Sequence, residues 1–302
     1  MVEQPSTALR ERRRPAAQAN EPPRSVLAGL IGSAIKASHM PRLHEQEGAA
    51  QGLAYVYRLI DLDALGLTVA ALPELISAAR RFGFNGLNIT YPCKQSIIPF
   101  IDELSDDARA LGAVNTVVCA SDGRTVGHNT DWSGFAESFR RELSDVPRRR
   151  VAQLGAGGAG AAVAQALISL GTAELAIVDR DQNRAGQLAF DICSRFGAGR
   201  AIASRDMSRA IADADGLVNA TPVGMVKHPG TPIDPALLRP DLWVADIIYF
   251  PRETELLRTA RSIGCRTMGG GGMAVFQAVG AFRLFTGREP DADRMIRHFH
   301  SL

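Results

Sequence analysis

A glycine-rich segment, G-A-G-G-A-G at residues 155–160, is the clearest chemical signal in the sequence. It follows a strand-like run and opens an apolar helical pattern. Such glycines let the backbone turn tightly and approach a pyrophosphate, whose charge is met by amides at the helix N-terminus. A turn that merely packs a helix closely on a sheet is the alternative, because the motif alone is weakly specific. We predict dinucleotide binding by Gly155, Ala156, Gly157, Gly158 and Ala159.

Charged residues after the next strand bear on the choice of cofactor. Asp179 ends that strand, where a carboxylate accepts hydrogen bonds from ribose hydroxyls and repels the 2′-phosphate of NADP. This position favours NAD. Arg180 and Arg184 follow at once and are able to pair with a 2′-phosphate, so NADP remains open.

An amine and a carboxylate in two other polar segments could move a proton. Lys94 lies just past a predicted strand, in N-I-T-Y-P-C-K at 88–94, and Asp131 ends the polar turn G-H-N-T-D at 127–131. A lysine held against a neighbouring domain can act as a general acid or base. The ordinary alternatives are a solvated surface lysine and an aspartate that caps a helix. The polar turn at Asn115 and Thr116 has the same structural alternative.

Apolar strand-like runs alternate with helical patterns in the first half of the chain. The patterns predict strands at 26–31, 55–60, 86–90 and 116–118, and helices at 72–82 and 106–111. This alternation favours a mostly parallel sheet.

A second block begins near residue 131. It reads as a helix at 131–143, strands at 151–154, 174–178, 216–219 and 243–246, and helices ending at 170 and starting at 182. That is about one doubly wound nucleotide-binding domain. Two final helices, 273–285 and 292–300, follow four glycines at 269–272, which we interpret as a hinge or a tight turn.

The predicted fold is therefore α/β, with an N-terminal substrate-binding domain and a C-terminal Rossmann domain for NAD(P) across a cleft. We expect a disordered extension at 1–24, which is rich in Pro and Arg. The substrate domain should span 25–131 and the Rossmann domain 132–274, with the helices of 275–302 returning to the first domain. Closure of the cleft would exclude water.

Composition excludes several classes of function. The 34 Lys and Arg nearly balance the 32 Asp and Glu, which argues against a nucleic-acid surface. Four scattered cysteines and six histidines show no metal-ligand spacing, so no metal is predicted. No apolar run approaches the roughly 18 residues of a membrane helix. We expect a cytoplasmic monomer or homodimer that binds a small molecule.

Six motifs together resemble the shikimate/quinate dehydrogenase family over residues 25–302. They are N-I-T-x-P-x-K at 88–94, G-A-V-N-T at 112–116, N-T-D at 129–131, G-A-G-G-A-G at 155–160, N-A-T-P-V-G-M at 219–225 and G-M-x-x-x-Q-A at 272–278. The sequence looks nearest to the NAD-using quinate/shikimate branch. The resemblance implies a hydride transfer between NAD and a ring hydroxyl of shikimate, quinate or a close cyclic polyol acid.

The resemblance also assigns roles to residues. Lys94 would take the proton from the ring hydroxyl during oxidation, and Asp131 would orient its ammonium form. The implied substrate-binding residues are Ser38, Asn88, Thr90, Asn115, Tyr249 and Gln277. Beyond the glycine turn and the charged residues, the implied cofactor-binding residues are Asn219, Thr221, Met225, Gly270 and Met273.

One position departs from the family pattern. The family places a second Ser or Thr before the proline that follows Ser38, and its hydroxyl holds the substrate carboxylate, whereas this chain has Met40. Losing such a donor costs about 1.5 to 3 kcal/mol unless His39, Lys36 or an altered substrate pose replaces it, so the cognate acid could differ from both shikimate and quinate. Three alternatives stay open: an NADP-dependent biosynthetic shikimate dehydrogenase, a non-catalytic NAD-binding regulatory protein, and a lysine-using dehydrogenase of folate carbon bridges.

Overall fold

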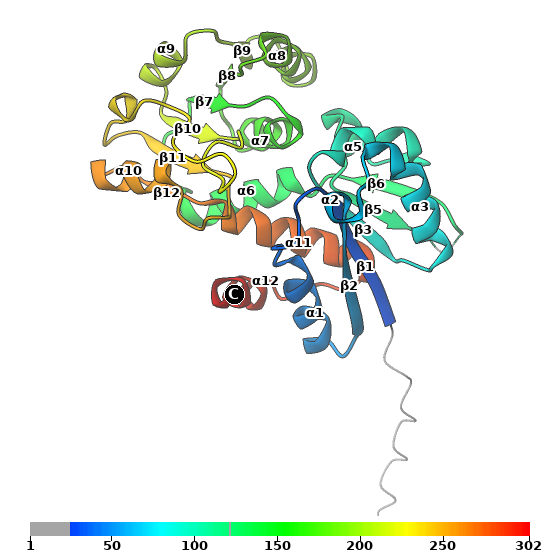
Figure 1. Ribbon diagram of the computed structural model, residues 1–302. Helices are drawn as coiled ribbons and strands as arrows, with labels where there is room; N and C mark the ends of the chain where they lie inside the picture. Colours follow the sequence, from blue (N-terminus) through cyan, green and yellow to red (C-terminus); the bar gives the residue numbers. More distant parts are fainter. Residues whose placement is uncertain (1–24, 121) are drawn as a thin grey trace, which may run out of the picture.

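The part of the chain that the structure describes folds around two six-stranded sheets, and two long helices join them (Figure 1). The structure is a computed structural model, and it describes residues 25–120 and 122–302. The predicted extension at 1–24 lies outside these residues. The two-domain α/β fold predicted from the sequence is confirmed.

The first sheet is mixed and has the strand order β2-β1-β3-β5-β6-β4. Strand β5 runs antiparallel to β3 and β6, while the other pairings are parallel, so the sheet is mostly parallel as expected. Its strands are β1 Ser25–Gly32, β2 Ala54–Asp61, β3 Gly86–Ile89, β4 Glu103–Leu104, β5 Thr116–Cys119 and β6 Thr125–His128. Its helices are α1 Met40–Ala50, α2 Leu62–Leu65, α3 Leu72–Arg81, α4 Cys93–Ser96 and α5 Asp106–Leu111, with short 3₁₀ helices at Val69–Ala71 and Ile98–Phe100.

The second sheet is a doubly wound parallel sheet of order β12-β11-β10-β7-β8-β9. The order reverses between β7 and β10, and ligands bind at the carboxyl ends of the strands at such a point. The strands are β7 Arg150–Leu154, β8 Glu174–Val178, β9 Ala201–Ala203, β10 Gly216–Asn219, β11 Trp243–Asp246 and β12 Thr267–Met268. The helices are α7 Gly158–Ser169, α8 Gln182–Phe196, α9 Met207–Ala212 and α10 Glu255–Ile263, with a 3₁₀ helix at Pro235–Leu237.

Helices α6, Asp131–Glu142, and α11, Gly270–Thr286, pack against each other and link the two sheets (Figure 1). Gly134 permits the close crossing, because a Cβ there would lie 2.7 Å from the backbone nitrogen of Gln277. In α11, Met273 packs in the core of the second sheet, and most of the later apolar residues pack against β1, β2 and α12, Ala292–Ser301. The crossing sets the start of α6 beside the middle of α11.

The four glycines at 269–272 do not form a tight turn. Helix α11 begins at Gly270, so most of the run makes its first turn. A Cβ on Gly270 would lie 2.2 Å from the carbonyl oxygen of Ile247, and one on Gly272 would lie 2.1 Å from Ser138 Oγ. Close packing requires these glycines, whereas the poor helix propensity of glycine suggested a break.

Buried aromatic residues fill the space between β2, α1 and α11. Tyr55 and Tyr57 point inward from β2, and the ring of Phe282 stacks on Tyr55. His44 is fully buried among these rings, and burial lowers the pKa of His44 to about 3. Its Nδ1 is 3.1 Å from the Tyr55 hydroxyl.

No helix in the described part of the chain is both long and apolar enough to cross a membrane.

Candidate active site

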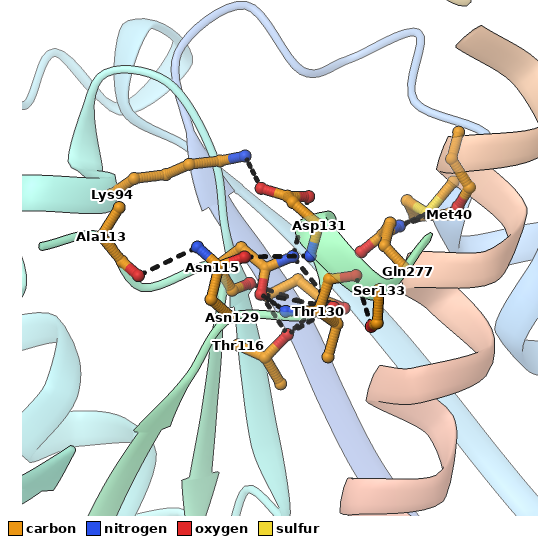
Figure 2. A network of polar contacts seen from close by, with 12 residues as sticks. Met40, Lys94, Ala113, Asn115, Thr116, Asn129, Thr130, Asp131, Ser133 and Gln277 are labelled. Carbon is orange, nitrogen blue, oxygen red and sulfur yellow. Dashed lines mark hydrogen bonds and ion pairs between the residues drawn. The ribbon is translucent and has the colours of Figure 1, made fainter. Parts of the chain in front are cut away.

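Lys94 and Asp131 form an ion pair (Figure 2). Lys94 lies in α4, just after β3, and Asp131 is the first residue of α6. The Lys94 Nζ donates to Asp131 Oδ2 over 2.5 Å. The side chains are 19% and 6% exposed, so Lys94 is not the solvated surface lysine of the alternative interpretation.

The carboxylate of Asp131 does not serve as a helix cap. Thr130 occupies the cap position of α6, and Asp131 Oδ1 accepts a hydrogen bond from Asn115 Nδ2 at 2.9 Å. The backbone N–H of Asp131 donates to Asn129 Oδ1 at 3.0 Å, which anchors the turn before the helix. Both carboxylate oxygens are therefore held by side chains from other elements.

Asn115 supports Asp131 with an amide whose orientation is fixed. Its Oδ1 accepts from the Thr130 backbone N–H at 2.7 Å, and its Nδ2 also donates to Thr130 Oγ1 at 2.9 Å. Figure 2 shows these contacts around the start of α6. Contact between Asn115 and a substrate hydroxyl, which the sequence suggested, would require exchange of one of these bonds.

Gln277 reaches the same region from α11. Its Nε2 donates to the Ala274 carbonyl oxygen at 2.9 Å and lies 3.3 Å from the sulfur of Met40. Met40 is 5% exposed at the start of α1, and its backbone N–H donates to Ser38 Oγ at 3.3 Å. The position that departs from the family pattern thus lies directly beside a predicted substrate-binding residue.

The remaining predicted substrate residues differ in accessibility. Thr90 follows β3 and is half-buried, whereas Asn88 is 4% exposed inside the sheet, where its amide bonds to Tyr57 and Thr116. Tyr249 follows β11 in the second domain. Burial raises the pKa of Tyr249, and the negative charge of Asp131 raises that pKa further. The side chain is 38% exposed, so a ligand can reach it.

The glycine turn after β7 is closely packed at Gly155 and open at Gly157. Gly155 has a φ of +97°, and a Cβ there would lie 2.7 Å from the Ala220 carbonyl oxygen. By contrast, no atom of the described residues lies within 4 Å of a Cβ built on Gly157. Helix α7 starts at Gly158, and among the described residues no side chain caps it. Its open N-terminal amides fit an anionic group of a cofactor.

Lys94 lies beside this turn. A Cβ on Gly158 would be 3.8 Å from Lys94 Cβ and 3.9 Å from Lys94 Cδ. The ion pair of the first domain and the nucleotide turn of the second therefore border the same space.

Asp179 contacts the glycine turn from the end of β8. Its Oδ2 accepts from the Ala156 backbone N–H at 2.7 Å, and its Oδ1 accepts from the Asp181 N–H at 2.8 Å. Arg180 is exposed. Arg184 is 3.4 Å from the carboxylate of Asp181. The cavity beside Ala156 and Gly157 is also lined by Arg184 and Arg195, so both charge signs lie near the glycine turn.

The other predicted cofactor residues divide into two groups. Met225 is 42% exposed near the end of the second sheet, so a ligand can reach it, whereas Met273 is 7% exposed and packs in the core. Gly270 provides the close approach to Ile247 described above. Asn219 is buried and accepts from the N–H and hydroxyl of Thr221, so these two residues shape the loop that carries Met225.

A buried carboxylate, Asp246, steadies the same loop. It accepts from Asn219 Nδ2 at 3.1 Å and from Thr254 Oγ1 at 2.8 Å, and burial raises the pKa of Asp246 to about 6.

Sequence reasoning missed Asp246, Asn129, Thr130 and Thr116 as parts of the site. The contiguous polar residues N-T-D and N-T were the available signal. Within residues 25–120 and 122–302, no three His, Cys, Asp or Glu side chains gather closely enough to hold a metal ion.

Comparison with known proteins assigns the family. Residues 30–117 match the shikimate dehydrogenase substrate binding domain, residues 137–225 the shikimate/quinate 5-dehydrogenase model, and residues 270–298 the shikimate 5′-dehydrogenase C-terminal domain. A protein of Streptomyces avermitilis named shikimate dehydrogenase (NADP(+)) is 58% identical over 90% of this chain and 94% of its own length. The chain belongs to the shikimate dehydrogenase family.

Two further relatives of this family use a different named cofactor. A protein of Corynebacterium efficiens named quinate/shikimate dehydrogenase (NAD(+)) is 52% identical over 92% of this chain and 99% of its own length. The structure of quinate dehydrogenase from Corynebacterium glutamicum in complex with NAD has a TM-score of 0.86 at 49% identity and covers 92% of this chain and 99% of that one. The protein is an oxidoreductase that acts on a CH–OH group with a nicotinamide dinucleotide, and the family predicted from the motifs is confirmed.

Proposed function

We propose that this protein transfers a hydride between NAD and a ring hydroxyl of shikimate, quinate or a closely related cyclic polyol acid, with Lys94 and Asp131 as its acid–base pair. The observation that carries the proposal is the 2.5 Å pair between these side chains beside the glycine turn. A non-catalytic NAD-binding protein would have no need for a buried ion pair at this place.

The proposed pair works on the proton of the reacting hydroxyl. The bound nicotinamide supplies the hydride acceptor during oxidation. Neutral Lys94 takes the hydroxyl proton at Nζ, and the Asp131 carboxylate stabilises the ammonium ion that results. During reduction Lys94 returns the proton to the same oxygen. Asn115, by donating to Asp131, keeps one carboxylate oxygen directed at Lys94.

We further propose the domain boundaries, the cellular compartment, the class of ligand and the oligomeric state of the enzyme. We assign the substrate domain to residues 25–131 and the nucleotide domain to residues 132–274, with the last helices returning to the first. The four cysteines have free thiols, which suits a reducing cytoplasm. We assign a small cyclic hydroxy acid as the binding partner, and a monomer or homodimer as the active form.

An assay of the purified protein with a panel of cyclic hydroxy acids tests the proposed function. We expect quinate, shikimate or a close analogue to reduce NAD, followed by the near-ultraviolet absorbance of the reduced nicotinamide. NADP tested in parallel addresses the alternative of a biosynthetic enzyme. Absence of turnover with every cyclic hydroxy acid and either cofactor would refute the proposed function.

Met40 should weaken the binding of a substrate carboxylate. Because methionine cannot donate a hydrogen bond, we expect Met40→Thr to lower the KM for quinate or shikimate by about tenfold, which corresponds to about 1.4 kcal/mol. Met40→Leu is the matched control, since it keeps an apolar side chain of similar size beside Gln277. A KM for Met40→Thr that equals or exceeds that of the wild type would show that position 40 imposes no carboxylate deficit.

A further inference from the structure

A chain of buried hydrogen bonds connects a tyrosine of β2 with the carboxylate of Asp131. The Tyr57 hydroxyl donates to Asn88 Oδ1 at 2.8 Å, and Asn88 Nδ2 donates to Thr116 Oγ1 at 3.1 Å. Thr116 Oγ1 then donates to Asn115 Oδ1 at 3.0 Å. Asn115 Nδ2 completes the path by donating to Asp131 Oδ1 at 2.9 Å.

The sheet explains how Tyr57 reaches Asn88 across an intervening strand. In the register, Tyr57 lies opposite Ala28 of β1, and Ala28 lies opposite Gly86 of β3. Asn88 is two residues after Gly86 and therefore projects from the same face. Ala28, which lies between them on β1, has a small side chain, and the Tyr57 hydroxyl reaches Asn88 Oδ1 at 2.8 Å. The space over Gly86 is filled by the ring of Phe285, since a Cβ on Gly86 would lie 2.2 Å from Phe285 Cε1.

Every bond in the chain is donated in the same direction. A tyrosine hydroxyl has one proton, so donation to Asn88 leaves Asn88 Nδ2 facing Thr116. Thr116 accepts there and has one proton of its own, for which Asn115 Oδ1 at 3.0 Å is a closer acceptor than Thr130 Oγ1 at 3.4 Å. The amide of Asn115 must then present N–H, and not oxygen, to Asp131.

We propose that Tyr57 is a positioning residue for the acid–base pair, because its hydroxyl sets the direction of the chain that ends on Asp131. This inference rests on the proposed function of Lys94 and Asp131. Tyr57, Asn88 and Thr116 are 4%, 4% and 0% exposed, so bulk water does not replace a lost partner. A broken chain leaves the Asn88 oxygen unpaired, and that amide is then held only through Nδ2, by Thr116 Oγ1 at 3.1 Å and by the Asn115 carbonyl oxygen at 3.4 Å.

A second hydrogen bond to Asn115 limits how much Tyr57 affects the orientation of the Asn115 amide. The Thr130 backbone N–H also donates to Asn115 Oδ1, at 2.7 Å, and favours the same amide orientation. Loss of the tyrosine hydroxyl therefore loosens the support of Asp131 without removing it. We expect a measurable decrease in rate and no abolition of activity.

Tyr55 provides a matched control on the same strand. It is 7% exposed, compared with 4% for Tyr57, and its hydroxyl is 3.1 Å from His44 Nδ1. Tyr55→Phe therefore removes an equally buried hydroxyl that bonds elsewhere. A purely structural role for Tyr57 predicts the same kinetic behaviour for both phenylalanine variants.

The experiment measures kcat and KM for the best substrate of the panel, together with thermal unfolding. We expect Tyr57→Phe to lower kcat roughly fivefold with KM unchanged, and Tyr55→Phe to keep kcat within about twofold of the wild type. Equal kcat values for the two variants, or an increase in KM that accounts for the whole effect of Tyr57→Phe, would overturn the inference.

A second variant interrupts the same chain nearer to Asp131. Thr116→Val lacks the relaying hydroxyl, whereas Thr116→Ser keeps it and should restore most of kcat. We expect Tyr57→Phe to add little to the loss already caused by Thr116→Val, because both break one chain. Additive losses would contradict this. If Lys94→Ala retained full activity, the proposed acid–base role of Lys94 and Asp131 would fail, whereas a slow Lys94→Ala with a normal Tyr57→Phe overturns only the present inference.

Discussion

Lys94→Ala is expected to lower kcat by about 10²- to 10⁴-fold, the range of general acid–base catalysis, while NAD still binds. The Lys94 amine, which donates to Asp131 over 2.5 Å, is the proposed base, and its removal leaves the reacting hydroxyl without this base. The glycine turn and Asp179 remain intact, so the affinity for NAD should change little. Steady-state rates and cofactor titration by fluorescence measure the two effects separately.

Lys94→Arg distinguishes proton transfer from the presence of a positive charge. Arginine keeps a cation beside Asp131 but does not release its proton in proteins. We expect this variant to be nearly as slow as Lys94→Ala. Substantial activity in Lys94→Arg would mean that the charge alone matters, and full activity in Lys94→Ala would remove Lys94 from the chemistry altogether.

Periodicity and turn residues sufficed to predict most of the fold. The strand Glu174–Val178, for example, agrees with its prediction, because a short apolar run bounded by turn residues leaves few alternatives. Short elements were missed, including β4, β6, β9 and β12, since three of them have only two or three residues and β6 has one large apolar residue, Val126. Helix α1 was also missed, because Pro41 and the polar residues after Met40 obscure its beginning.

The local parts of the candidate site were also visible in the sequence. The glycine turn and the polar segments around Lys94 and Asp131 are contiguous motifs, and the structure brings them together. Nonlocal packing was not visible. Gly270 lets α11 start against the backbone of Ile247, just after β11, and Gly272 lets α11 pack closely against Ser138 of α6. Likewise, the bond from Tyr57 to Asn88 depends on strand order and register, which no single segment encodes.

The cofactor preference is expected to be NAD, and Asp179→Ser should reduce that preference by about 10²-fold. A carboxylate at about 4 Å from a phosphate interacts with an energy of about 4 kcal/mol at an effective dielectric of 20, and relaxation reduces this figure. Asp179 is fixed toward the glycine turn by its bond to Ala156 N, so it cannot swing away at low cost. Serine keeps a hydrogen-bonding group for the ribose but removes the charge.

The named relatives leave this preference open, because the Streptomyces protein is named for NADP and the Corynebacterium proteins for NAD. The ratio of kcat/KM with NAD to kcat/KM with NADP is the quantity to measure. Asp181→Asn is the control, since it removes a neighbouring charge while an amide oxygen still caps α8. We expect it to change the ratio less than Asp179→Ser does, because Asp181 has no bond to the turn. A wild-type preference for NADP, or a ratio unchanged in Asp179→Ser, would show that Arg180 and Arg184 decide the cofactor instead.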